Sequence, residues 1–356
     1  MRRRVKNYRG ARSGLAGVAI PVLIVLCIIA AGVLYFVNDN SVFTKEGDAV
    51  VATKENVPEE KSPDVSDVII EQVEGPEKET NITDADNVKE KTEAVRALFI
   101  GISDVKDSVR FSGKLEEAKN SGANTVVLEV KAEDGTLAFT TDHSFVADKQ
   151  LSGEDELLKK AISEARENGF SVALYISCFK DNGAAHSNFE NAVIQKDNGW
   201  IWRDDSDSRW LSAYSTGSQE YITGIIEKLA GFVPDEIILA NVSFPATGNI
   251  GSIDYGENTA QKAEVISAFA EKAIKAAGNV SVSAVYENYD ANRLPGSGQD
   301  IGTFKRWFKA LYVARDGGKN TLSFDTARTA AADDAYMLIP VAPSFDAGAD
   351  SFMIRK

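Results

Sequence analysis

PDEIILANVSFP, residues Pro234–Pro245, is the stretch from which the architecture is most easily recognised. Glu236–Ala240 is a short apolar run after a helix-like stretch, and such runs are typical of buried parallel strands that lead into a loop. In barrels of strand–helix repeats, chemistry takes place where strands end and loops begin. Ala240, Asn241 and Ser243 occupy that place here. The stretch therefore predicts a barrel strand without a carboxylate at its end.

Strand and helix patterns alternate on both sides of this stretch. Strand–helix–strand repeats at this spacing imply parallel strands with right-handed crossovers. An open doubly wound sheet is the alternative, but no G-x-G-x-x-G opens the first unit, so a dinucleotide site is unsupported. The expected strands are Ala97–Ile100, Thr125–Val130, Val172–Ile176, Glu236–Ala240 and Val280–Val285, and the expected helices are Lys114–Asn120, Glu154–Asn168, Gln219–Ala230 and Thr259–Ala277.

The pattern is less regular after Gly302. Phe304–Val313 mixes a helix with a strand, and Thr321–Phe324, Tyr336–Val341 and Ser351–Ile354 could supply the last short strands. We therefore expect an α/β fold, a (β/α)8 TIM-like barrel that could be incomplete or degenerate in its last units.

The N-terminal part of the chain predicts a membrane anchor and a spacer. Leu15–Val37 is an uncharged run of 23 residues, long enough for one transmembrane helix and longer than the apolar core of a cleaved signal peptide, the alternative. Basic residues precede it and an acidic stretch follows, so the positive-inside rule places the N-terminus in the cytoplasm. The expected parts are a basic tail (1–14), an anchor (15–37), a disordered acidic linker (38–94) and an extracytoplasmic barrel (95–356).

Composition excludes several kinds of partner and cofactor. The net charge of −14 argues against nucleic acid, and two histidines make a histidine-rich zinc site a poor expectation. Cys27 lies in the apolar run and Cys178 in the outer domain, so they cannot form a stabilising disulfide. The acidic run near Asp204 lacks the glycine and distal glutamate of an EF-hand calcium loop. No cofactor or metal is expected.

The Pro234–Pro245 stretch resembles the D-E-I-x-F-D-Y-[VI]-R-F-P pattern of a bacterial family of extracytoplasmic, glycosyl-hydrolase-like (β/α)8 barrels of unknown function. The resemblance extends over roughly residues 97–299. The family's second Asp, its Tyr and its Arg fall on Ala240, Asn241 and Ser243, so the resemblance implies a divergent member. The matching residues are Asp235, Glu236, Ile237, Val242, Phe244 and Pro245.

The second strand resembles the family pattern N-x-x-V-I-D-V-K-D-x-x-G, with Glu129 in place of the first Asp. Since glycosidases use two carboxyl groups, the resemblance implies that Glu129 is the best candidate for one of them. Glu129 would point inward together with Val127 and Lys131, and Lys131 would contact substrate. The alternative is a buried Glu129–Lys131 charge network that supports the barrel mouth.

The third strand region resembles the family's I-A-R-I-V-x-F-K-D pattern. Lys180 and Asp181 match its end and would face a ligand, although a surface ion pair of little energetic value is an equal alternative.

A tryptophan-rich loop, Asn198–Tyr214, resembles the family's G-x-x-W-x-D-x-x-G-x-x-W loop. Because aromatic rings stack on the apolar faces of sugars, Trp200, Trp202 and Trp210 are expected to form a carbohydrate platform. Alternatively, the rings pin the loop to the barrel.

The fifth strand region, Val280–Gln299, resembles S-A-D-V-F-G followed by G-x-G-Q, which implies ligand contacts at Gln299. Val285 or Tyr286 occupies the Asp position, so Glu287 could substitute only if the loop reorients. Asp325, expected at the end of a late strand, is a further catalytic candidate, and Asn241 a further ligand contact.

These residues leave two functions open. A degenerate barrel that binds carbohydrate or cell-wall glycan without turnover is favoured by the residues at Ala240, Ser243 and Val285. An active glycoside hydrolase of envelope or extracellular polysaccharide, with Glu129 and a partner at Asp325 or Glu287, is the alternative. A purely structural envelope protein would require a buried tryptophan loop. In each case the expected location is the cell membrane, with contact to the lipid bilayer through Leu15–Val37.

Overall fold

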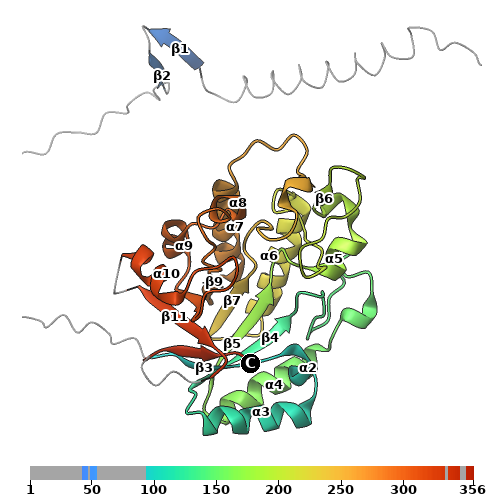
Figure 1. Ribbon diagram of the computed structural model, residues 1–356, viewed down its shortest axis with the longest axis vertical. Helices are drawn as coiled ribbons and strands as arrows, with labels where there is room; N and C mark the ends of the chain where they lie inside the picture. Colours follow the sequence, from blue (N-terminus) through green and yellow to red (C-terminus); the bar gives the residue numbers. More distant parts are fainter. Residues whose placement is uncertain (1–41, 47–48, 54–93, 333–335, 345–349) are drawn as a thin grey trace, which may run out of the picture. The chain divides into compact units, whose positions relative to one another are not determined.

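The computed structural model describes residues 42–46, 49–53, 94–332, 336–344 and 350–356 (Figure 1). The chain divides into two compact units, Met1–Asp86 and Asn87–Lys356. The predicted anchor, Leu15–Val37, and the basic tail lie outside the described residues. Among the helices that are described, none combines the length and the apolar character needed to span a membrane.

The first unit contains a β-hairpin that the composition did not predict. Strand β1 (Val42–Glu46) pairs antiparallel with β2 (Ala49–Thr53). Both strands fall within residues 38–94, the stretch expected to be a disordered linker. VFTKE and AVVAT are rich in β-branched residues, a local preference that the acidic composition of the whole segment conceals.

The second unit is a closed barrel of eight parallel strands, which confirms the predicted fold class. Each strand pairs with the next one in the barrel, and the last strand closes the ring through the pair Phe352–Arg96. The strands are β3 (Arg96–Ile100), β4 (Thr125–Lys131), β5 (Ser171–Ser177), β7 (Glu236–Ala240), β9 (Ser281–Val285), β10 (Ala310–Ala314), β11 (Met337–Ala342) and β12 (Phe352–Ile354).

Helices follow the strands and cover the barrel (Figure 1). The α-helices are α2 (Ile102–Val105), α3 (Ser108–Asn120), α4 (Asp155–Glu167), α5 (Asn182–Ser187), α6 (Thr216–Ala230), α7 (Lys262–Ala277), α8 (Leu294–Ser297), α9 (Ile301–Trp307) and α10 (Phe324–Ala331). The 3-10 helices are η1 (Lys149–Leu151), η2 (Phe189–Asn191) and η3 (Ile250–Ser252), and β6 (Ile194–Gln195) pairs with β8 (Ile253–Asp254) in a small antiparallel sheet.

Two apolar layers hold the barrel together. Side chains along each strand alternate between the helices and the barrel interior, as the pleat requires. On β4, Val126 and Leu128 belong to the layer packed under the helices, whereas Val127 belongs to the interior layer. The interior layer also contains Tyr175 and Tyr312, whose rings fill the space between the strands.

The last units are complete, although one predicted strand is a helix. Thr321–Phe324 was expected as a strand, but Ser323 precedes α10 and Phe324 begins it. Asp325 in the first turn favours a helix N-terminus, which explains the difference. The mixed segment after Gly302 resolves into α9 and β10, and the two remaining predicted strands are confirmed as β11 and β12.

Candidate functional site

A cavity of about 290 Å³ lies at the carboxyl ends of the barrel strands. Its lining includes groups that follow β4, β5, β7, β9 and β12, so residues far apart in the sequence meet there. This is the end at which barrel enzymes place their chemistry. The polar and aromatic side chains of the lining are Glu133, Asp204, Glu287, Lys180, Arg355, Asn241, Ser206, Thr247, Thr321, Tyr175, Tyr286, Tyr289 and Trp210.

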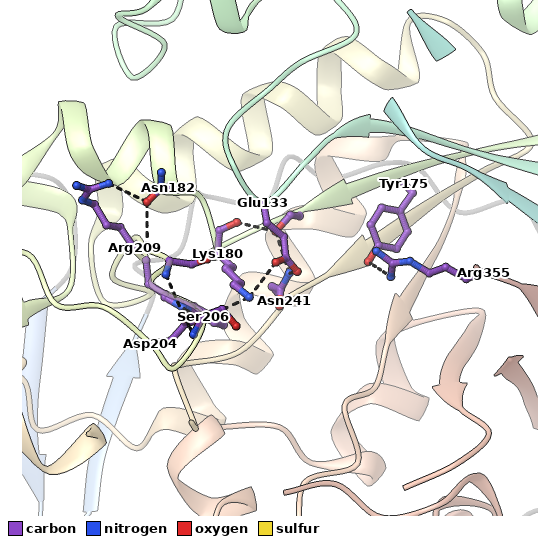
Figure 2. A network of polar contacts seen from close by, with 12 residues as sticks. Glu133, Tyr175, Lys180, Asn182, Asp204, Ser206, Arg209, Asn241 and Arg355 are labelled. Carbon is purple, nitrogen blue, oxygen red and sulfur yellow. Dashed lines mark hydrogen bonds and ion pairs between the residues drawn. The ribbon is translucent and has the colours of Figure 1, made fainter. Parts of the chain in front are cut away.

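Glu133 is held by two donors from neighbouring strand ends. Lys180 Nζ lies 2.8 Å from its Oε2, and Asn241 Nδ2 donates to its Oε1 over 3.2 Å (Figure 2). Lys180 also lies 3.4 Å from the buried Asp204 carboxylate. The lysine therefore bridges two carboxylates, one after β4 and one in the tryptophan loop.

A glycine turn after β4 positions Glu133. Gly135 has φ +95°, and its amide donates to the carbonyl of Ala132 over 3.1 Å, so the chain reverses directly after the strand. A Cβ at Gly135 would lie 2.9 Å from Asp181 Oδ1 and 3.0 Å from Gly183 Cα. Glycine is required here both for the backbone conformation and for the space.

Asn241 adopts a left-handed conformation, with φ +52°, directly after β7. Its Nδ2 donates to Ser177 Oγ over 2.9 Å as well as to Glu133. This geometry places the predicted contact residue Asn241 in the cavity lining, where its amide orients the carboxylate of Glu133.

Glu287, in the loop after β9, also lines the cavity. Burial, and after it the nearby charge of Glu133, raise the pKa of Glu287 to about 7, although Arg355 and Lys180 oppose the shift. Its backbone N–H donates to Gln299 Oε1 over 3.1 Å. Gln299 is itself buried, so it holds the loop, and it is not part of the lining.

Glu129 lies outside the cavity lining. It is half-buried, and its Oε2 accepts a hydrogen bond of 3.0 Å from the backbone of Ile102, at the start of α2. Burial raises the pKa of Glu129. The side chain therefore supports the turn after β3 and is not presented to a ligand in this cavity.

A β-bulge explains why the predicted Glu129–Lys131 network is not formed. Glu129 pairs with Tyr175 and Lys131 with the very next residue, Ile176, so one strand residue is extra. Lys131 is thereby directed toward α6, where its Nζ lies 5.8 Å from the centre of the Tyr221 ring. The expectation that Lys131 points inward and contacts substrate is wrong.

Lys131 instead forms a fully buried ion pair with Asp181, at 2.7 Å. Its Nζ also donates to the carbonyl of Ser177 over 2.6 Å, and Asp181 accepts from the Ala184 amide at the start of α5. Asp181 was expected to face a ligand, but these contacts make it a structural group. Of the predicted pair, only Lys180 lines the cavity.

The tryptophan loop does not form a platform of three rings. Trp202 and Trp210 are 2% and 3% exposed, whereas Trp200 is 71% exposed and lies outside the cavity lining. Trp202 Nε1 donates to Asn249 O over 3.1 Å, and Trp210 Nε1 donates to Asp204 Oδ2 over 3.0 Å. The alternative, that rings pin the loop to the barrel, fits Trp202 and Trp210.

Asp325 is exposed in the first turn of α10 and is not in the lining, so it is not placed to act with Glu287. Sequence reasoning missed Glu133 and Arg355 as site residues. Glu133 follows β4 and precedes Asp134-Gly135, and Arg355 follows β12, so both stand where barrel catalysts are sought.

Two other cavities lie away from the carboxyl ends of the barrel strands. One, of about 410 Å³, lies beside β6 and β8, and another, of about 230 Å³, lies at the opposite barrel mouth against Glu236. In barrels of this kind the opposite mouth serves stability. Within the described residues, no group of three His, Cys, Asp or Glu side chains is arranged to hold a metal ion.

The barrel resembles glycoside hydrolases of known structure. The glycoside hydrolase domain of PgaB (BpsB) from Bordetella bronchiseptica has a TM-score of 0.55 at 14% identity, covering 74% of this chain and 94% of that domain. α-L-Fucosidase isoenzyme 2 from Paenibacillus thiaminolyticus has a TM-score of 0.51 at 14% identity, covering 70% of this chain and 40% of its own. An exo-β-N-acetylglucosaminidase from Vibrio harveyi has 0.50 at 12%, covering 70% and 41%. The likeness therefore concerns the fold, and this chain spans less than half of the two larger enzymes.

At the level of sequence, no curated protein matches the chain. A domain family described as "Putative glycosyl hydrolase domain" matches residues 97–305, which is more than half of the chain. The match begins in β3 and ends in α9, and it includes Glu133, Lys180, Asn241 and Glu287. The chain therefore belongs to this glycosyl-hydrolase domain family, in a divergent form.

Proposed function

We propose that the barrel is a glycoside hydrolase in which Glu287 is the acid and Glu133 its partner carboxylate. The observation that carries this proposal is the meeting of the two groups in one cavity, in different environments. Glu287 has a pKa raised to about 7 by burial, whereas Glu133 contacts a lysine and an amide donor. An acid with a raised pKa in the same cavity as a second carboxyl group that is held by donors is an arrangement suited to acid–base catalysis.

In this mechanism, protonated Glu287 donates its proton to the glycosidic oxygen as the bond to the anomeric carbon breaks. The carboxylate of Glu133 either attacks that carbon or removes a proton from the attacking water. Lys180 and Asn241 orient Glu133, and their contacts suit an anionic carboxylate. Water finally supplies the hydroxyl group on the sugar and the proton that restores the acid.

Turnover of a broad panel of aryl glycosides and oligosaccharides by the full chain tests this proposal. Glu287→Gln and Glu133→Gln should each lower kcat by about 10²-fold or more, because each removes a proton-transfer or nucleophilic group. Glu271→Gln, at an exposed position on α7, is the matched control and should leave kcat unchanged. Equal turnover by all four proteins would reject the assignment.

A second candidate is carbohydrate binding without turnover. It is favoured by Ala240, which is buried inside the barrel at the end of β7 and stands where the family pattern has an acid. If this candidate holds, the wild-type chain binds oligosaccharides without cleaving them. The Gln variants then retain binding, which calorimetry detects separately from product formation.

We further propose that the chain is anchored by Leu15–Val37, with the basic tail in the cytoplasm and the barrel outside, where it meets envelope or extracellular glycan. The charge difference across the apolar run supports this topology. Protease added to intact cells should release the barrel from the membrane fraction. Recovery of uncut chain after digestion, with a lysed-cell control that is cut, would contradict the topology.

A further inference from the structure

Arg355 enters the cavity from the end of β12. Its backbone N–H donates to Ala342 O over 2.9 Å, which continues the pairing of β12 with β11 by one residue. The guanidinium lies against two aromatic rings, with Cζ 4.3 Å from the centre of Phe99 and 5.0 Å from that of Tyr175. Nη1 donates to the hydroxyl of Tyr175 over 3.0 Å, and Figure 2 shows the two side chains in contact.

The two cations of the cavity differ in their partners. Lys180 lies within 4 Å of the carboxylates of Glu133 and Asp204. Arg355 has no ion pair of this kind with any residue that the structure describes. A guanidinium carries five N–H donors in a planar fork, and the Tyr175 hydroxyl accepts from one nitrogen. The aromatic rings attract the positive charge but offer no in-plane acceptors to the remaining donors.

A simpler role for Arg355 is to balance nearby negative charge. Its charge lowers the pKa of Glu287 and of Glu129, so it acts on both carboxyl groups beyond direct contact. Any cation at this position would have that effect. Charge balance does not explain why the half-buried guanidinium of Arg355, at the cavity wall, has no carboxylate partner among the described residues. Arginine forks match planar carboxylate and tetrahedral oxyanions geometrically, in contrast to the point charge of lysine.

We propose that Arg355 binds an anionic group of the substrate, so that the carbohydrate recognised by this cavity carries a carboxylate, sulfate or phosphate. This inference rests on the proposed carbohydrate function and specifies its substrate class. Lys180 lies between Glu133 and Asp204 and offsets one of their two negative charges. The anion would occupy the side of the cavity formed by Tyr175 and Arg355.

The test uses the full chain on an array in which each anionic oligosaccharide is printed beside its neutral counterpart. Uronates are paired with their methyl esters, and sulfated or phosphorylated glycans with the free hydroxyl compounds, so the pairs distinguish the sources of the anion. Wild-type chain should bind at least one anionic glycan about tenfold more tightly than its neutral counterpart, as expected for a charge-assisted contact.

Two variants and one control locate the effect. Arg355→Gln should abolish the preference for the anionic member, and Arg355→Lys should retain part of it, because the charge remains while the fork is lost. Arg306→Gln removes an exposed arginine that also lies over an aromatic ring, Trp307, but outside the cavity, and should retain the full preference. Thermal melting checks that each variant is folded.

The outcomes separate this inference from the function on which it rests. Binding only to neutral counterparts, or an unchanged preference in folded Arg355→Gln, overturns the inference and leaves the carbohydrate function in place. Binding to no glycan on the array overturns both. The comparison of esters with uronates uses wild-type chain, so it stays decisive even if a variant fails to fold.

Discussion

Glu287 is the residue whose protonation the proposed reaction depends on. Burial raises its pKa above the ordinary value to about 7, so it is protonated below that pH and charged above it. A general acid acts in its protonated form, so kcat/KM should decline as the pH rises through about 7. Initial rates across the pH range check this, and a decline centred near the ordinary pKa of a glutamate would contradict it.

Lys131 and Asp181 form the most deeply buried ion pair that is described, with both side chains fully buried. Removing one partner leaves an uncompensated charge, so Lys131→Met should lower the free energy of unfolding by about 3–5 kcal/mol. Urea titration of the variant measures this.

Replacing both partners is the control for that prediction. The double variant Lys131→Met/Asp181→Leu leaves no isolated charge and should recover much of the loss. A single variant within about 1 kcal/mol of wild type would show that water reaches the remaining charge.

At the scale of the element, the turn after β4 determines where Glu133 lies. Gly135→Ala places a methyl group against Asp181 and Gly183 in a left-handed conformation, so it should cost more than about 1 kcal/mol and displace Glu133. Gly122→Ala is the matched control, because Gly122 has φ +70° but open space around its Cβ position. Thermal melting should show a larger loss at Gly135 than at Gly122.

Elements with a strong local pattern could be predicted from the sequence. The strands β3, β4, β5, β7 and β9 are confirmed because each is an apolar run between turn signals. The bulge at Lys131 could not be predicted, since it depends on pairing with β5 and not on the composition of β4. The hairpin of β1 and β2 was missed because the composition was judged over the whole acidic segment, in which two short strands contribute little.

The tryptophan loop shows that the orientation of side chains, like the bulge, could not be predicted from local sequence. A sequence pattern indicates that Trp202 and Trp210 belong to a functional loop, but whether a ring faces a ligand or the core depends on packing. The candidate site was predicted only in part, because it too depends on packing in three dimensions and not on local sequence. Lys180, Trp210, Asn241 and Glu287 are in the cavity, whereas the three-dimensional proximity of Glu133 and Arg355 becomes visible only when the barrel is closed.

At the scale of the whole molecule, the barrel floor contains a second buried acid. Glu236 points into the barrel interior, where Tyr312 lies 3.4 Å from its Oε2 and its Oε1 has no hydrogen-bond partner among the described groups. Burial raises its pKa, so the wild-type fold loses stability as the pH rises through that raised pKa.

Glu236→Gln should remove this dependence, because an amide carries no charge to bury. The melting temperature of the variant should rise relative to wild type as the pH rises above the ordinary pKa of a glutamate, because only wild type then has to charge a buried carboxyl group. Asp235→Asn, at the neighbouring half-exposed carboxylate, is the control. A difference between wild type and Glu236→Gln that stays constant as the pH rises would contradict the explanation.

The pairing of β12 with β3 also governs the order in which the molecule can assemble. Phe352 and Arg96 are neighbours in the ring, although 256 residues separate them along the chain. A chain that is synthesised or exported from its N-terminal end cannot make this contact until its final strand has emerged. Until then, the backbone groups along one edge of β3 have no strand to pair with. The cavity is completed by the same event, because Arg355 follows β12 directly. The cavity is therefore complete only when the ring closes, and until then the open edge of β3 is exposed to aggregation.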